Sequence, residues 1–88
     1  MTLVKNVIGS SEYDLPRGYS SWREYWEDKM KRRFSDCSRE GCNRKAEDGG
    51  HVQKTNGSSK FIVPLCKECN NPANTDSYFV RDNDLLAL

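Results

Sequence analysis

Apolar residues recur at three- and four-residue steps between residues 22 and 34, which is the period of an α-helix with one buried side. Ser21 precedes this segment and Glu24 lies three residues later, a spacing typical of a helix-capping box. Acidic residues lie early in the segment and basic residues late, as the helix dipole favours. The pattern predicts an amphipathic helix from Trp22 to about Arg33. Its apolar stripe consists of Trp22, Tyr25, Trp26, Met30 and Phe34.

A second pattern predicts a β-hairpin in the middle of the chain. Residues 52–55 and 58–61 flank Asn56-Gly57, the dipeptide that two-residue type I′ hairpin turns prefer. This spacing places Val52 opposite Phe61 and His51 opposite Ile62. The second strand then leads through a proline and a leucine into a segment that we expect to be a short helix.

The two ends of the chain carry weaker patterns. Residues 3–8 predict a short strand that ends at the glycine and serines of 9–11, and Pro16-Arg17-Gly18 predicts a turn. Residues 78–80 and 85–86 predict strand-like segments with a turn at 82–84 between them. The expected fold class is therefore α+β.

Composition limits the size of the core. The chain has 88 residues, of which 35% are hydrophobic and 31% are charged. We expect one domain, residues 1–88, in which residues 1–35 form the first strand, a turn and a supporting helix, and residues 36–88 form a second module. So short and polar a chain buries little apolar surface, and such chains commonly need a metal or disulfides to fold.

Four cysteines are the candidate residues for such a metal site or for disulfides. Cys37 and Cys42 form a C-x4-C pair, and Cys66 and Cys69 form a C-x2-C pair after an interval of 23 residues. Each pair places two thiolates close enough to bind one ion, and Gly41 permits the tight turn that the first pair needs. The spacing predicts a structural Zn²⁺ site with four sulfur ligands and no open position for water.

Two disulfides are the alternative interpretation of these cysteines. Disulfide frameworks belong to secreted chains. The residues that begin this sequence lack the apolar core and cleavage pattern of a secretory signal, and no apolar run reaches the roughly 20 residues that a membrane span needs. We therefore expect a reducing, cytoplasmic setting, which favours zinc, and no membrane partner.

The segment from the first cysteine pair to Asn71 resembles a known family. A cysteine turn, a hairpin and a helix that carries the last two ligands are the parts of a treble-clef zinc finger. The residues Gly-Gly-His-Val at 49–52 and Ile-Val-Pro-Leu-Cys-Lys-Glu-Cys-Asn at 62–70 resemble the zinc-bearing branch of the HNH endonucleases, whose ββα-metal core is a treble-clef variant. The resemblance covers about residues 37–71.

The resemblance implies two catalytic positions. The histidine of the first family strand is the general base that activates water, and it corresponds to His51. The helix residue after the last cysteine helps to hold a catalytic Mg²⁺ or Mn²⁺, and it corresponds to Asn70. Two positions depart from the family pattern. Gly50 stands where a metal-binding aspartate is expected, and Phe61 stands where the family has an asparagine.

These departures leave several interpretations of the site open. Loss of a carboxylate weakens a magnesium site, because Mg²⁺ prefers hard oxygen ligands that usually include carboxylates. Asp48 is three residues from His51 and is a candidate replacement through the glycine link. His51 itself is interpreted as a structural residue, as the catalytic base, or as a zinc ligand in place of a cysteine.

Basic residues gather near the predicted helix end and the first cysteine pair, although the net charge of the chain is only +1. With the helix tryptophans, they suggest a nucleic-acid surface in which aromatic rings stack on bases and cations bind phosphates. The competing interpretation is that the tryptophans pack on the zinc unit. The candidate nucleic-acid-binding residues are Lys29, Lys31, Arg32, Arg33, Arg39, Arg44 and Lys45.

The leading functional hypothesis is an HNH-like treble-clef zinc module without catalysis that binds nucleic acid or a protein partner. One alternative is a metal-dependent endonuclease with His51 as its base. Another is a protein-directed adaptor or inhibitor, for which the tail at residues 82–88 would suit docking. The oligomeric state is left open by the sequence.

Overall fold

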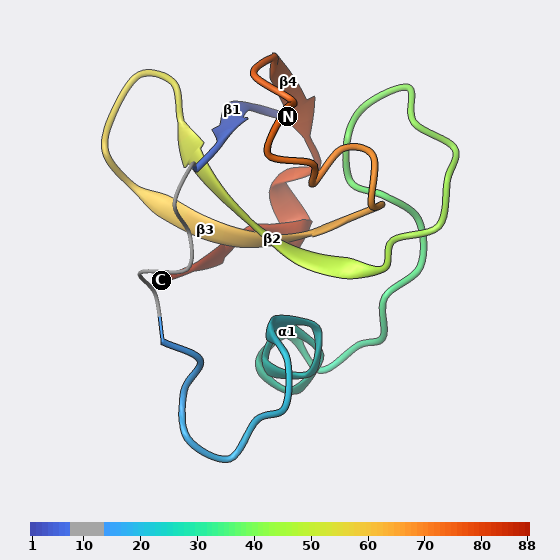
Figure 1. The fold of residues 1–88 in the computed structure, drawn as a ribbon, viewed down its shortest axis with the longest axis vertical. Coiled ribbons are helices and arrows are strands. Elements are labelled where there is room, and N and C mark those ends of the chain that lie inside the picture. The colour runs from blue at the N-terminus through green and yellow to red at the C-terminus, as the bar shows by residue number, and fades with distance from the viewer. Residues whose placement is uncertain (8–13) are drawn as a thin grey trace.

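The computed structural model describes residues 1–7 and 14–88. Within these residues, five strands form one antiparallel sheet and a single α-helix packs beside it, which confirms the α+β class (Figure 1). The sheet order is β4-β1-β2-β3-β5. The elements are β1 (Thr2–Asn6), α1 (Trp22–Met30), β2 (Asp48–Lys54), β3 (Lys60–Leu65), β4 (Ser77–Val80), a 3₁₀ turn (Asp82–Asp84) and β5 (Leu86–Ala87).

The hairpin of β2 and β3 has the predicted register. Val52 lies opposite Phe61, and His51 lies opposite Ile62. The predicted type I′ turn is wrong, because Asn56 and Gly57 do not have the positive φ angles which that turn requires. The strands end earlier, at Lys54 and Lys60, and residues 55–59 form a longer connection between them.

The first strand lies inside the sheet, between two other strands, and its sequence pattern does not predict this position. β1 pairs with β2 on one side and with β4 on the other, so that it joins the two ends of the chain to the hairpin. The strand prediction for residues 3–8 is confirmed as far as Asn6, and its last residue lies outside the described part of the chain, as do residues 9–11. The predicted turn at 16–18 is present, with Gly18 at φ 97°.

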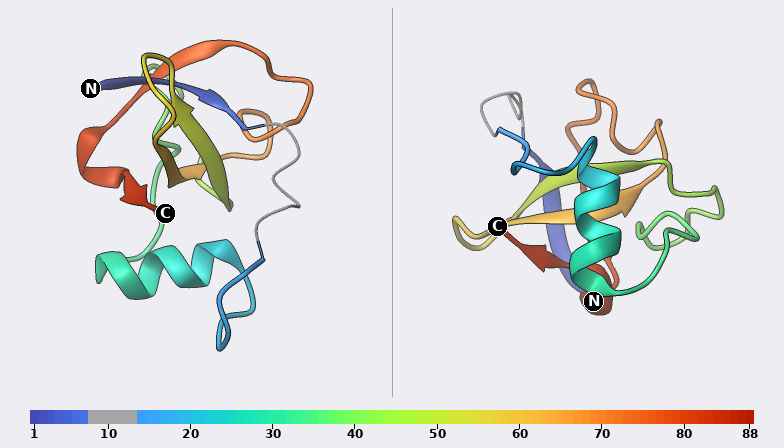
Figure 2. Two further views of the ribbon diagram at one scale, coloured as in Figure 1. Left: turned by 90° about the vertical axis from the view of Figure 1, so that its left-hand side faces the viewer. Right: turned by 90° about the horizontal axis from the view of Figure 1, so that it is seen from below.

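The two faces of the sheet pack on different parts of the molecule. Val4, Val52, Val63, Tyr78 and Val80 are buried in one cluster with three of the cysteines. The other face packs on α1, which contacts β2, β3 and β5 (Figures 1 and 2). The core of this small protein is therefore continuous with the cysteine cluster.

The helix begins as predicted and ends early. Ser21 caps it, since its side chain accepts a hydrogen bond from the Glu24 amide at 3.0 Å. The helix ends at Met30 and not at Arg33, because Lys31 adopts the left-handed conformation with φ 59°. Beyond this turn, the Phe34 amide donates to the Glu27 carboxylate at 2.8 Å, which holds the chain in its new direction.

Trp26 fixes the helix to the C-terminal segment. Its side chain is 1% exposed, and its indole Nε1 donates to the carbonyl of Asp84 at 2.8 Å. The Phe34 ring packs against it edge-on, with ring centroids 5.1 Å apart. Trp26 is therefore a core residue with no exposed face for a nucleic-acid base, but it packs on the C-terminal segment and not, as expected, on the cysteine cluster.

The C-terminal segment contains the expected strands and turn. Residues 77–80 form β4, residues 86–87 form β5, and residues 82–84 form a 3₁₀ turn between them. The tail is packed along β3 through β5 and is not a detached docking arm. No helix in the described residues has the length and apolar character to cross a lipid bilayer.

Candidate metal centre

The four cysteines converge on one point. Their sulfur atoms all lie within 4.8 Å of one another, and the described residues contain no disulfide among them. The Sγ atoms of Cys42 and Cys66 are 3.9 Å apart. Cys37, Cys66 and Cys69 are buried and Cys42 is half-buried, so that the cluster opens toward solvent on the side of Cys42.

These dimensions match one tetrahedral ion site. Zn–S bonds of about 2.3 Å place the sulfurs of a tetrahedron about 3.8 Å apart. A disulfide requires a bond of about 2.05 Å, which is far shorter than the separation of Cys42 and Cys66. The prediction that all four cysteines form one metal site is confirmed at the level of their arrangement.

The first pair lies on a closed loop. The Cys37 amide donates to the Arg44 carbonyl at 2.9 Å, and an isolated bridge joins Asp36 to Lys45, so that the loop between them closes on itself. Gly41 has φ 82°, the left-handed conformation that turns Cys42 back toward Cys37. The role expected of this glycine is confirmed.

The second pair lies on one turn after β3, and the predicted short helix is absent. The Asn70 amide donates to the Cys66 carbonyl at 3.0 Å, which closes a single α-type turn. The Cys69 amide points at the Cys66 sulfur at 3.5 Å. Pro72 cannot donate to a helical hydrogen bond, and the Asn71 side chain instead accepts from the Ala73 amide.

Two asparagines brace this turn from distant parts of the chain. The Cys69 carbonyl accepts hydrogen bonds from Asn6 Nδ2 at 2.7 Å and from Asn74 Nδ2 at 3.0 Å. The Tyr78 hydroxyl donates to the Asn6 side-chain oxygen in turn. Sequence reasoning missed these residues, because nothing in the local pattern connects Asn6 to a cysteine 63 positions later.

The burial of the cysteine thiols makes the cluster suited to a bound cation. Burial raises the pKa of the Cys37 thiol and that of the Cys69 thiol. Burial opposes ionisation of Cys66 as well, but hydrogen bonds from the Cys69 amide and thiol lower the pKa of Cys66 overall. Buried thiolates need positive charge close by, and a coordinated divalent ion supplies it.

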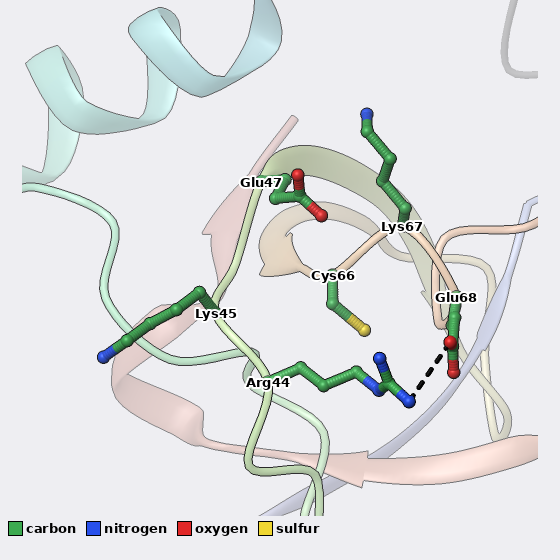
Figure 3. A pocket seen from close by; sticks show the side chains of 6 residues that line it. All are labelled: Arg44, Lys45, Glu47, Cys66, Lys67 and Glu68. Atoms are coloured by element: carbon green, nitrogen blue, oxygen red, sulfur yellow. Dashed lines mark ion pairs between the residues drawn. The ribbon is translucent and has the colours of Figure 1, made fainter.

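A hollow with an open mouth lies beside the cluster, with a volume of about 490 Å³. In Figure 3 the Cys66 sulfur points into this hollow, and the Arg44 guanidinium extends across it to the Glu68 carboxylate, an ion pair of 3.2 Å. Lys45 and Lys67 extend outward from its rim. The cysteine cluster is thus bordered by charged groups on its solvent side.

His51 lies apart from the thiols. It neighbours Val52, whose side chain joins the cysteine cluster, and successive strand residues face opposite sides of a sheet. The His51 ring is 6% exposed and packs edge-on against Trp22, with ring centroids 4.7 Å apart. Burial lowers the pKa of His51, which keeps the imidazole neutral. The histidine is not part of the metal-ligand group in the described residues.

Asn70 and Asp48 line a different hollow from the one beside the thiols, with a volume of about 580 Å³, between the start of α1 and the start of β2. The Asp48 carboxylate forms an ion pair of 3.5 Å with Lys67. His51 is not among the lining residues; its ring packs against that of Trp22, the first residue of α1, which does line the hollow. The structure therefore does not bring His51, Asn70 and Asp48 together at one cavity.

Gly50 has no room for the carboxylate that the family pattern expects there. A Cβ atom at this position would lie 2.4 Å from Leu65 Cδ1 and 2.8 Å from Asn70 Oδ1. Contacts this short force neighbours to move. An aspartate at position 50 would therefore have to displace the Leu65 and Asn70 side chains.

The seven candidate nucleic-acid-binding residues are dispersed. Most form contacts with acidic or aromatic side chains: Lys29 over Tyr25, Lys31 with Asp28, Arg32 with Asp84, Arg39 with Asp76 and Tyr78, Arg44 with Glu68, and Lys45 with Asp36. Arg33 is exposed beside the helix end. Arg32 is a structural residue, since it also packs on the Trp26 ring at 4.8 Å.

Comparison with known proteins adds no further assignment: no family model, no curated protein and no solved structure matches this chain. The chemistry of the four-cysteine cluster and of the surfaces around it carries the functional conclusions.

Proposed function

We propose that this chain is a zinc-stapled, non-catalytic binding module whose partner is nucleic acid. The observation that carries the proposal is the convergence of four thiols on one tetrahedral point. Four sulfur ligands fill the coordination of Zn²⁺ and leave no position for water or substrate, which is the design of structural zinc sites.

Zinc is the proposed ion because of the donor set. Tetrahedral sites of four thiolates are typical of zinc or of iron–sulfur centres. Of the two, Zn²⁺ is the ion that is neither oxidised nor reduced in proteins. Structural zinc contributes on the order of 10 kcal/mol to folding in small domains. Chelation should therefore unfold the module, and a circular dichroism spectrum that is unchanged after complete metal removal would contradict the proposal.

The finer architecture that we propose is an HNH-like treble clef. Its support is the order of parts: the turn of the first cysteine pair, the β2–β3 hairpin, and the turn of the second pair. The last helix of that architecture would be reduced to one turn here, because Pro72 follows closely. The chemistry of the HNH family is proposed to be lost, and the scaffold kept.

Loss of catalysis is supported by the surroundings of His51. A general base must reach the water that it activates. His51 is covered by Trp22, and Gly50 cannot be exchanged for a metal-binding aspartate without moving Leu65. We expect no nicking of supercoiled plasmid with Mg²⁺ or Mn²⁺. Cleavage by the purified protein that disappears in His51→Ala would instead establish the endonuclease alternative.

Nucleic acid is the proposed partner because basic groups border the metal cluster. Arg44, Lys45 and Lys67 line one hollow together with Glu47 and Glu68. Of the acidic partners of these cations, Glu68 and Asp36 are exposed and Asp48 is half-buried. Exposed ion pairs contribute little, typically under about 1 kcal/mol, so that phosphates can compete for these cations. Binding through phosphates should weaken steeply as salt is added.

The test of this proposal compares two charge-matched variants. Arg44→Gln/Lys45→Gln should weaken binding to DNA or RNA and reduce its salt dependence, because two phosphate contacts are lost. Arg17→Gln/Arg23→Gln removes the same charge at two exposed positions that neither line the hollow nor belong to the candidate nucleic-acid-binding residues, and it serves as the control. If the unmodified protein binds neither DNA nor RNA at low salt, the nucleic-acid proposal fails and the protein-directed adaptor takes its place.

A further inference from the structure

One side of the four-cysteine cluster is open to solvent. Cys42 is half-buried, and the residues next to it within 40–44 are exposed. The other three cysteines, Cys37, Cys66 and Cys69, are at most 7% exposed. A small reagent in solution therefore reaches the Cys42 sulfur before it reaches the other three.

Cys66 lies beside Cys42 on this open side. The Sγ atoms of the two residues are 3.9 Å apart. Of the four cysteines, Cys66 lines the hollow of about 490 Å³, and its sulfur points into that hollow (Figure 3). Cys42 and Cys66 therefore form the side of the cluster that faces solvent.

The two sulfurs can form a bond after a short movement of the exposed loop. A disulfide of about 2.05 Å requires the 3.9 Å separation to shorten by about 1.9 Å. The turn of Cys66 is fixed by the hydrogen bonds that two distant asparagines donate to the Cys69 carbonyl. The Cys42 amide donates to the Arg39 carbonyl at 3.1 Å, within its own loop. We therefore expect the loop of Cys42 to supply the movement.

Exposure decides which of the four sulfurs reacts first with an oxidant. Oxidants attack the thiolate form of cysteine, and zinc coordination requires that form of all four ligands. Redox-active cysteines are typically partly exposed and close to cations. The hollow beside Cys66 is lined by three cations and two carboxylates: Arg44, Lys45, Lys67, Glu47 and Glu68.

We propose that Cys42 and Cys66 are a modification site for peroxides, at which oxidation forms a Cys42–Cys66 disulfide and releases the zinc. This inference rests on the proposed zinc site and adds redox control to it. Cys37 and Cys69 do not complete a tetrahedral site by themselves. Because structural zinc supplies folding free energy to small domains, the oxidised chain should lose its fold.

The chemistry takes two steps. The Cys42 thiolate attacks one oxygen of hydrogen peroxide, the O–O bond breaks, and a sulfenic acid and a hydroxide ion form. The Cys66 thiolate then attacks the Cys42 sulfur, the S–O bond breaks, and a second hydroxide ion leaves. The two thiolates have together lost two electrons, and the peroxide has been reduced to two hydroxide ions. A dithiol reductant reverses the modification by thiol–disulfide exchange.

Peptide mapping tests the proposal directly, because each cysteine lies on its own tryptic peptide. Cleavage after lysine and arginine separates the four cysteines onto residues 34–39, 40–44, 61–67 and 68–81. The zinc-loaded full chain is treated with hydrogen peroxide while a chromogenic chelator reports released zinc, and an untreated sample is the control. Free thiols are then blocked with N-ethylmaleimide before digestion and mass spectrometry. The first disulfide should join peptides 40–44 and 61–67, and each disulfide should release one zinc.

Circular dichroism of the same samples follows the fold, which should be lost with the zinc and should return with dithiothreitol and added zinc. The inference is overturned if the first disulfide includes peptide 34–39 or 68–81, or if all four cysteines are oxidised at the same rate. It is overturned as well if the zinc stays bound after the disulfide forms, or if peroxide leaves the zinc-loaded chain unchanged. In these cases the zinc module itself stands. The proposed function fails with the inference if the purified chain binds no zinc at all.

Discussion

Asp84→Asn should lower the free energy of unfolding of the zinc-loaded protein by about 2 kcal/mol. The Asp84 side chain is 5% exposed and receives two guanidinium hydrogen bonds of 2.9 Å, one from Arg32 and one from Arg81. Arg81 also donates to the backbone carbonyls of Asp36 and Cys37. This carboxylate therefore links the helix end, the C-terminal segment and the loop of the first cysteine pair.

The magnitude follows from the number and exposure of these bonds. Hydrogen bonds to charged groups contribute about 1.5–3 kcal/mol each. Asparagine keeps one acceptor for one arginine and turns an NH₂ group toward the other. Both arginines are 46% exposed, so that water screens part of the loss. The bonds outweigh the cost of burial, since they lower the pKa of Asp84 although burial alone would raise it.

The assay is urea unfolding followed by tryptophan fluorescence at pH 7 with excess zinc. A loss of about 2 kcal/mol moves the midpoint by roughly 1 M urea for a protein of this size. Asp82→Asn is the matched control, since Asp82 lies in the same 3₁₀ turn but is 61% exposed, and its partners among the described residues are the N-terminal amine and Thr2. Equal midpoints for the two variants would refute the reasoning.

The remaining predictions concern Gly50 and His51. Gly50→Ala should destabilise the protein by about 1–3 kcal/mol in the same urea assay, because the new methyl group overlaps Leu65. Gly57→Ala is the control, since its methyl group would meet open space and should change the urea midpoint little. Equal effects of the two substitutions would contradict the packing around Gly50. Burial lowers the pKa of His51 in the folded state. Between this pKa and the ordinary value of about 6.5, the unfolded state therefore binds more protons than the folded state does. The free energy of unfolding should fall as the pH drops through this range. The stability difference between the unmodified protein and His51→Asn, measured in excess zinc from pH 7.5 to 5.5, should shrink toward acid pH, and a constant difference would show that His51 titrates as it does in the unfolded chain.

The sequence predicts the features that short-range rules control. The capping by Ser21, the register of Val52 with Phe61 and the left-handed turn at Gly41 all follow from residues a few positions apart. The metal-site prediction follows from the same kind of information, because the ligands come as two close pairs and one ion accounts for both.

Long-range contacts account for what the sequence does not predict. Residues 31–33 are good helix formers, but the helix ends because Lys31 adopts the left-handed conformation. The next residue, Arg32, donates a hydrogen bond to Asp84, which lies 52 positions later in the sequence. Local propensity is weaker than such tertiary contacts. The burial of Asp84 has the same origin, because aspartate is buried only where its charge is paired.

The missing helix after Cys66 and the asparagine brace show the same limit. One turn after Cys66 is sufficient to place both sulfurs, and Asn71 and Pro72 then lead the chain away. Asn6 reaches Cys69 only because β1 pairs with β4 and β2, a topology that its short apolar pattern does not specify.

X-ray absorption at the zinc edge of the purified protein distinguishes a four-thiolate zinc site from the alternatives. We expect one zinc per chain with four sulfur neighbours at about 2.3 Å and no nitrogen or oxygen in the first coordination sphere. A light-atom ligand from His51 or water, or a folded chain without zinc, would contradict this expectation.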